Sequence, residues 1–280
     1  MKPYIGGQAV IEGVMMKGPK KVAVAVRKPT GGIAVKVMPY SSATSHFPLG
    51  LPFIRGIVFL FEMLALGMKT LLWSADQQMD EKESLSGGEL TLTVVASLAI
   101  AIGLFLVVPY AAAWLVVGKP TSLLFNLVDG IVRLLIFLAY IWVIGWAKDV
   151  KRLYEYHGAE HAAVNCFEAD KPLTVANARR FSTIHPRCGT SLLAYVIGIS
   201  IVVFSLIRTD VWYLNLFFRL LTVPVIGGIG YELLRLSARY KENRLFWLLA
   251  LPGRWTQRIT TQRPDAKQLE VAIAALKKAL

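Results

Sequence analysis

The chain has 280 residues, of which 55% are hydrophobic, and its mean hydropathy is +0.52. These values exclude an ordinary soluble domain and are typical of membrane proteins. The net charge of +13 indicates basic cytoplasmic loops in contact with the anionic headgroups of a lipid bilayer. The chain lacks interleaved aromatic and basic residues, so this charge does not indicate nucleic-acid binding. Two cysteines are too few for a disulfide framework. The apolar region begins only after residue 46, so we expect no secretory signal.

Residues 1–46 are predicted to form a cytoplasmic segment. Its first part is rich in glycine and has no helical period. The stretches KKVAVAVRK and GIAVKVMPY then alternate around a Pro-Thr-Gly-Gly turn, which predicts a β-hairpin. The glycines in the first part allow the backbone to approach another surface closely.

Residues 47–73 are apolar, but Arg55, Glu62 and Lys69 recur every seven residues along them. This spacing places the three charges on one stripe of a helix. We therefore expect an interfacial or re-entrant helix here. Residues 74–90 are polar and are predicted to be a linker.

Two transmembrane hairpins are expected next, at residues 91–147 and 190–236. Their four spans, 91–117, 123–147, 190–207 and 211–236, can each cross a hydrocarbon core, the third only just. The turns are Gly118–Pro120 and Arg208–Asp210. The basic tail, 237–280, carries an amphipathic piece near 245–251 and a terminal helix after Pro264. The fold class is thus a mainly α, polytopic membrane protein with four transmembrane helices.

The distribution of lysine and arginine predicts the orientation. Residues 1–46 carry seven, residues 148–189 carry seven and the tail carries nine, whereas the two hairpin turns carry only Lys119 and Arg208. By the positive-inside rule, both termini and the 148–189 loop face the cytoplasm. The expected location is the inner membrane.

Several charges fall inside the predicted spans. Asp129 and Arg133 are one helical turn apart and should pair, whereas Arg219 and Glu232 are too far apart to pair with each other. Such charges tend to face the interior of a bundle. Glu232 lies near the cytoplasmic end, where it can reach arginines of the 148–189 loop. Pro224 and the glycines after it can break the last span.

The residues that bind metals are concentrated between residues 154 and 191, which hold three of the four histidines and both cysteines. His157 and His161 are four apart, so their imidazoles share one face of a helix. His185 and Cys188 follow on a turn. Two ligands from a helix and one or two from a later turn can close a tetrahedral zinc site, and thiolate with imidazole favours zinc. The alternative is a hydrogen-bonded polar layer without metal.

Three acidic or amide side chains lie beside these histidines. Glu160 is a candidate general base acting on metal-bound water; alternatively it orients a histidine or is a surface charge. Asn165 and Glu168 share the histidine face of the helix. Cys166 falls off that face and is expected to be a buried apolar residue.

A basic stretch without acidic residues runs from Lys171 to Thr209, and it includes Arg179, Arg180 and Arg187. Thr174 is expected to cap a short helix, 175–183, that carries the arginine pair. Such a strip suits phosphate on a lipid headgroup or another phosphorylated substrate. The alternative is that it reports membrane orientation alone.

The N-terminal segment has one acidic residue, Glu12. We expect this segment to pack onto the 154–189 loop, with Glu12 accepting from Arg187 or another loop arginine, or lying behind the metal ligands, and with Gln8 lining the same pocket. The alternative is a local pair between Glu12 and Lys17.

The stretches GGQAVIEGVMMKGP, YHGAEHAAVNCFE and HPRCGTS resemble the YqhQ-like family of bacterial multi-pass membrane proteins, a domain of unknown function described as predicted metal-dependent enzymes. The resemblance implies an inner-membrane location and supplies no substrate. Three functions stay open: a zinc-dependent hydrolase at the cytoplasmic face, acting on a lipid, peptide or phosphorylated substrate; a scaffold or regulator with a structural zinc site; and a transporter or channel.

Overall fold

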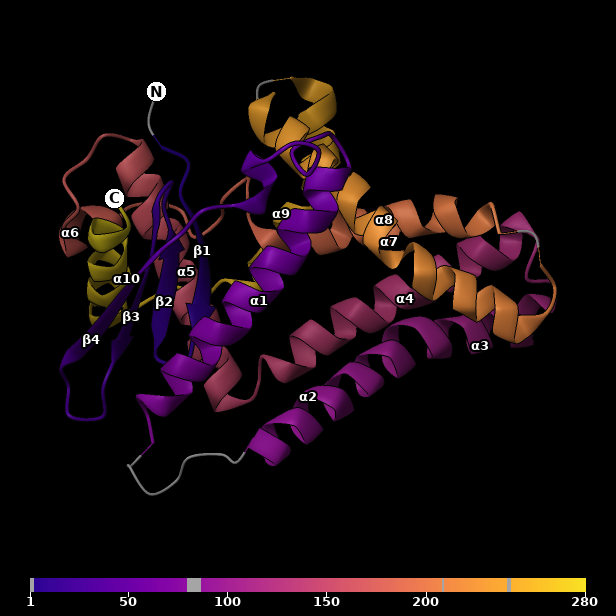
Figure 1. Cartoon of the computed structure of the whole chain (residues 1–280), viewed down its shortest axis with the longest axis horizontal. Coiled ribbons are helices and arrows are strands. Elements are labelled where there is room, and N and C mark those ends of the chain that lie inside the picture. The colour runs from indigo at the N-terminus through magenta and orange to yellow at the C-terminus, as the bar shows by residue number, and fades with distance from the viewer. Residues whose placement is uncertain (1–2, 80–86, 208, 241–242) are drawn as a thin grey trace.

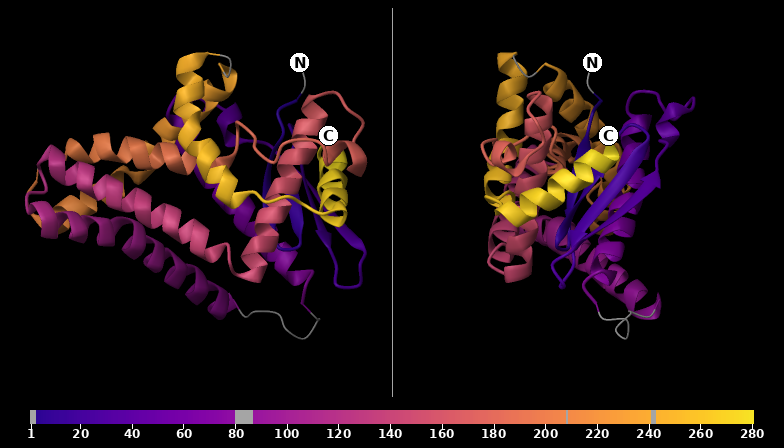
Figure 2. Two further views of the ribbon diagram at one scale, coloured as in Figure 1. Left: turned by 180° about the vertical axis from the view of Figure 1, so that it is seen from behind. Right: turned by 90° about the vertical axis from the view of Figure 1, so that its left-hand side faces the viewer.

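The computed structural model describes residues 3–79, 87–207, 209–240 and 243–280. A layer that contains a β-sheet lies at one end of the molecule, and a bundle of long helices extends away from it (Figure 1). Both chain ends lie at the sheet end, as the view from behind also shows (Figure 2). Arg208 and residues 80–86 of the predicted polar linker fall outside the described residues.

The sheet has four antiparallel strands in the order β1 (Gly6–Val10), β2 (Gly13–Lys17), β3 (Lys21–Arg27) and β4 (Ile33–Pro39). The predicted hairpin is β3–β4. The glycine-rich segment before it, for which no strands were predicted, forms a second hairpin. Strand β2 is buried on both faces, so its apolar residues do not alternate with polar ones and the usual strand pattern is missing.

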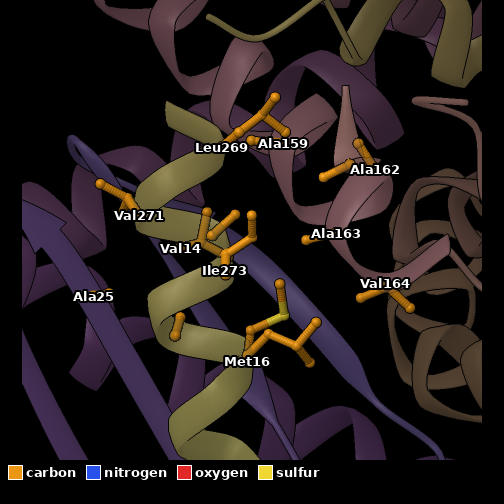
Figure 3. Close-up of a cluster of buried hydrophobic side chains, with 14 of the residues drawn as sticks. Val14, Met16, Ala25, Ala159, Ala162, Ala163, Val164, Leu269, Val271 and Ile273 are labelled. Carbon is orange, nitrogen blue, oxygen red and sulfur yellow. The ribbon is translucent and has the colours of Figure 1, made fainter. Parts of the chain in front are cut away.

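Helices cover both faces of the sheet. On one face, side chains such as Val14, Met16 and Ala25 pack against α5 (Lys148–Glu168) and α10 (Ala266–Ala279), as Figure 3 shows. On the other face, strand residues such as Val24 pack against α1 (Ile54–Asp76). Because successive strand residues point to opposite faces, β2 and β3 supply both cores. Three alanines of α5, Ala159, Ala162 and Ala163, are fully or almost fully buried in the first core.

The helical bundle follows the predicted spans. An apolar helix built from α2 (Gly87–Ile102), a π-helical turn η2 (Gly103–Val107) and α3 (Val108–Val117) is followed by α4 (Leu123–Ile144), α7 (Gly189–Ser205) and α8 (Trp212–Arg239). Among the described residues, four helices are long and apolar enough to cross a membrane: α1, α2–α3, α4 and α8. Helix α7, with 17 residues, is shorter than a standard span, which needs about 20.

Helix α1 was predicted to be interfacial or re-entrant, and by length and composition it qualifies as a span. Its first half crosses α8 closely, because Gly56 lies against the backbone of Gly228. There Arg55 pairs with Glu232 at 2.5 Å, so Glu232 does not reach the arginines of the 148–189 loop as predicted. Its second half covers the sheet. The helix thus joins the bundle to the sheet.

The described residues of the two turns of the bundle lie at the end far from the sheet (Figure 1). Thr121 in the first donates to the Asp210 carboxylate in the second at 3.0 Å. It follows that the C-terminal end of α4, the N-terminal end of α7 and the C-terminal end of α8 all face the sheet layer.

Buried charges connect the helices of the bundle. Asp129 and Arg133 pair at 2.6 Å, as predicted. Arg219 of α8 also reaches Asp129, with 2.9 Å between guanidinium and carboxylate, and is bound by Asn215 and Asn126. Helix α8 runs through Pro224 without a break, so the predicted interruption is absent.

The remaining helices are α6 (Val175–Ala178) and α9 (Arg244–Thr260), with a short 3₁₀ turn η1 (Ala43–Ser45) before α1. Thr174 caps α6 as predicted, accepting from Asn177 N at 3.2 Å, but the helix is shorter than expected. Helix α9 is longer than the predicted amphipathic piece, and its C-terminal end packs beside α5 and α7.

Candidate metal centre

Three of the four predicted ligands lie together at the junction of the sheet layer and the bundle. His157 and His161 come from α5, and Cys188 is the residue that caps the start of α7. One ligand atom from each lies within 4.8 Å of the other two, and His157 Nε2 is 3.2 Å from Cys188 Sγ. Zinc bonds of 2.0–2.3 Å in a tetrahedron place ligand atoms roughly 3.3–3.8 Å apart. The three atoms therefore need only a small adjustment to hold zinc.

Backbone carbonyls fix the orientation of both imidazoles. His157 Nδ1 is 2.9 Å from the carbonyl oxygen of Thr260, and His161 Nδ1 is 2.6 Å from that of Thr183. A carbonyl oxygen only accepts hydrogen bonds, so each Nδ1 carries the proton and each Nε2 presents a lone pair. Metal-ligating histidines are usually held in this way.

Cys188 lies at the N-terminus of α7, where its side chain caps the helix. Its Sγ accepts from the backbone N–H of Thr190 at 3.4 Å and contacts the Thr190 hydroxyl at 3.1 Å. The side chain is buried. Cys166, by contrast, is buried, as predicted, and its sulfur faces the carbonyls of Lys171 and Pro172.

His185 is a neighbour of the three ligands rather than a fourth. Its ring centroid is 5.7 Å from that of His161, and its Nε2 is 3.5 Å from the Glu168 carboxylate. Its Nδ1 accepts from the backbone N–H of Arg187 at 3.3 Å. Burial lowers the pKa of His185, which favours the neutral imidazole.

Two amides hold the loop that carries His185 and Cys188. Asn165 donates to the carbonyls of Ser182 and Ile184 at 2.8 and 3.2 Å. Gln257 of α9 accepts from His185 N–H at 2.8 Å and donates to its carbonyl at 3.0 Å. Asn165 was predicted from its place on the histidine face of the helix, whereas Gln257 was not predicted. The only signal for Gln257 is a polar run, Thr256-Gln257 and Thr260-Thr261, at the end of an otherwise apolar and basic helix.

Glu160 is buried beside the ligands. Its Oε2 is 4.0 Å from His161 Nε2, the nitrogen that faces His157 and Cys188 in the candidate cluster. Its carboxylate also lies against Gly7 of β1, where an added Cβ would come within 2.5 Å of Oε1. Burial raises the pKa of Glu160 to about 7, against the opposing effect of His157. The glycine-rich N-terminus thus approaches the site closely, as predicted.

Glu12 pairs with a loop arginine, but the partner is Arg152, not Arg187. It also accepts from the Tyr156 hydroxyl at 3.3 Å. Lys17 is not its partner, since that ammonium lies over the Tyr40 ring, 4.4 Å from the centroid. Glu12 therefore anchors the N-terminal segment on α5, and it does not touch the ligands.

Gln8 was predicted to line the site, and this prediction is wrong. Its amide packs against Gly67 of α1, where an added Cβ would come within 2.5 Å of Oε1. Gly7 and Gln8 are neighbours on a strand, so they point to opposite faces of the sheet. Gly7 faces α5, and Gln8 faces α1.

The predicted basic strip does not converge on the site. Arg179 and Arg180 are exposed at the end of α6, and among the described residues neither side chain forms an ion pair with a site residue. Arg187 is closer: its guanidinium pairs with Glu168 and stacks on the Tyr4 ring at 4.9 Å. Glu168 in turn contacts His185, so Arg187 and Glu168 flank the site.

The fold and the site together define a class: a mainly helical protein with four candidate membrane spans, a four-stranded sheet, and a His-His-Cys cluster where the two parts meet. The chain belongs to the family described as "Protein of unknown function (DUF1385)", whose profile matches residues 51–280. It is 32% identical over 297 residues to the uncharacterized protein YqhQ of Bacillus subtilis (strain 168), covering 99% of this chain and 92% of that protein. No solved structure matches the chain.

Proposed function

We propose that this protein is a zinc-dependent hydrolase of the bacterial inner membrane, with its site at the cytoplasmic surface. The observation that carries the proposal is the arrangement of His157, His161 and Cys188, whose Nε2 and Sγ atoms converge while both Nδ1 atoms are held by carbonyls. A zinc ion held by these three residues alone would keep a fourth position for water or substrate, as catalytic zinc sites do.

The residues of the site have different chemical roles. Zinc, when bound by the three ligands, supplies a Lewis acid that activates water for attack on a carbonyl or phosphoryl centre. Glu160, whose carboxylate is 4.0 Å from His161 Nε2, is placed to take up and release a proton at that carboxylate as a general base and acid. Gly7 keeps space for the carboxylate, and Gln257 and Asn165 hold the loop between the ligands.

The orientation in the membrane is part of the proposal. The sheet layer, helix α5 and both termini are at one end of the bundle (Figure 1), and the lysines and arginines of the chain are concentrated in these segments. The positive-inside rule then places this end in the cytoplasm. Exposed basic residues there favour a substrate with phosphate, or a peptide with acidic groups.

A structural zinc site is the second candidate. The observation in its favour is that the cluster joins α5, α7 and, through Thr260 and Gln257, α9, while His161 and Cys188 are buried. In that case zinc would fold the junction, and the protein would act as a scaffold or regulator. A transporter or channel is the third candidate; the unbroken α8 removes the feature of the sequence that favoured it.

Metal analysis of the purified full-length protein separates these candidates. We expect zinc bound in a one-to-one ratio, lost in His161→Ala and kept in His46→Ala, which changes the exposed histidine outside the site. Glu160→Gln should keep zinc and abolish hydrolysis of phospholipid, peptide and phosphate-ester substrates. Zinc retained by His161→Ala would contradict the metal site, and full activity of Glu160→Gln would favour the structural role.

A further inference from the structure

An open pocket of about 340 Å³ lies beside the metal centre. Its lining includes Trp142, Gly145 and Trp146 from the end of α4, Tyr154 from α5, and Arg258 and Gln262 from the end of α9 and the segment after it. The volume is within the range of small-ligand sites. None of these residues belongs to the site described above.

The pocket and the metal centre share a wall. The segment 260–262 runs along α5, with the Thr260 carbonyl bound to His157 and Gln262 N–H donating to the Tyr154 carbonyl at 3.0 Å. The Gln262 carbonyl lies directly against Gly158. Tyr154, in the pocket, and His157, in the metal centre, are thus one turn of α5 apart.

Two tryptophans place the pocket at the end of a candidate span. Trp142 and Trp146 are 54% and 67% exposed, and their rings meet edge to face with centroids 4.6 Å apart. Trp142 lies in the last turn of α4, and Trp146 lies two residues beyond its end. Helix α4 is apolar and long enough to cross a membrane. Tryptophan is enriched at this depth, where its ring meets the lipid headgroups.

Helix α9 supplies the pocket's positive charge. It carries Arg244, Arg254 and Arg258 and no acidic residue, and it exposes large apolar side chains: Leu245, Trp247, Leu248, Leu249 and Trp255. Its opposite face, with Gln257 and Thr260, is buried against the site. This pattern is typical of a helix that lies in the membrane interface. Among the described residues, no carboxylate forms a salt bridge with Arg258.

We propose that this pocket binds the phosphate headgroup of an anionic phospholipid. Arg258 pairs with the phosphate, Gln262 donates to a headgroup oxygen, and the tryptophan pair contacts the glycerol backbone and the first acyl carbons. The exposed apolar faces of α4 and α9 favour a lipid over free phosphate, because only a lipid gains from both. A lipid held here lies one turn of α5 from His157. We infer that phospholipid is the substrate class, and this inference about the substrate rests on the proposed function.

Quenching of tryptophan fluorescence by brominated lipids tests the pocket in the full-length protein in mixed micelles. Brominated phosphatidylglycerol should quench more strongly than brominated phosphatidylcholine, and Arg258→Gln should weaken the apparent affinity for phosphatidylglycerol at least about fivefold. The matched control is Arg244→Gln, an exposed arginine at the other end of α9, with little effect expected. Replacing Trp142 and Trp146 by phenylalanine should remove the quenching specific to phosphatidylglycerol.

Three outcomes would overturn the proposal: equal quenching by the two lipids, equal losses in Arg258→Gln and Arg244→Gln, or displacement of the lipid by glycerol phosphate at equal concentration. The second would mean a diffuse surface charge, and the third a site for a soluble phosphate. Lipid binding should persist in His161→Ala. Failure of the metal proposal is therefore distinguishable from failure of the pocket.

Discussion

Glu160 of α5 and Gly7 of β1 are in direct contact, and the contact joins the N-terminal strand to the candidate metal centre. The carboxylate occupies the space that a side chain at position 7 would fill. The same carboxylate lies 4.0 Å from His161 Nε2. The absence of a side chain at Gly7 therefore allows Glu160, the proposed base, to occupy this position.

Gly7→Ala tests this relationship. The clash involves the end of a flexible side chain, so we expect the carboxylate to move at a cost below about 1 kcal/mol in unfolding free energy. Zinc content should be unchanged, and hydrolysis should fall about a hundredfold or more, as for loss of a general base. Gly6→Ala is the control, because an added Cβ there meets no atom within 4 Å. Equal activity of the two variants would show that Glu160 need not occupy this position.

Gly158→Ala should act differently, through stability. Its new Cβ would collide with the backbone carbonyl of Gln262. That carbonyl cannot move without separating α5 from residues 260–262, where the Thr260 carbonyl accepts from His157. We expect a loss of about 1–3 kcal/mol in unfolding free energy, the usual cost of overpacking, together with reduced zinc content. Thermal unfolding and metal analysis measure the two effects. Gly189→Ala, at an open position, should change neither, and a Gly158→Ala protein with normal unfolding would contradict the packing described here.

The sequence predicted those parts of the site that depend on local geometry. His157 and His161 share a helix face because helical spacing requires it. Cys188 was predicted on the non-helical turn that follows this helix in the chain. Gln257 and Thr260 were not predictable, because they come from a helix about a hundred residues later in the chain. Their docking depends on close contacts such as Gly253 against Ser191, and no periodic pattern reports such contacts.

The fold shows the same division. Apolar helices were predictable from length and composition, and β3–β4 from alternation around a turn. Strands β1 and β2 were not, because glycine is disfavoured in strands and both faces of β2 are buried. The side of the sheet that Gln8 faces depends on the register of β1 in the sheet, and the composition of β1 does not specify that register.

Glu12→Gln tests how strongly Glu12 anchors the N-terminal segment on α5. Glu12 pairs with Arg152, whose side chain is 48% exposed, so we expect a loss of about 0.5–1 kcal/mol, near the upper end for solvent-exposed pairs. Zinc content should not change, because Glu12 does not touch the ligands. Arg152→Gln should give a loss of similar size, and the double variant should cost less than the sum of the two. Additive losses, measured by denaturant unfolding, would mean that the pair contributes nothing.

Asp129→Asn should have the largest effect on the bundle. Asp129 is fully buried and is the only carboxylate, among the described residues, within salt-bridge distance of both Arg133 and Arg219. Removing its charge leaves two buried guanidiniums without a counter-ion, and breaking a buried ion pair in this way typically costs about 3–5 kcal/mol. Asp76→Asn, at an exposed position at the end of α1, is the control. Thermal unfolding in detergent should show a large decrease in melting temperature for Asp129→Asn and almost none for Asp76→Asn.

Adding Arg219→Met to Asp129→Asn should recover part of the lost stability, because one of the two unpaired charges is then gone. If the double variant is less stable than Asp129→Asn alone, Arg219 stabilises the bundle through Asn126 and Asn215 rather than through Asp129.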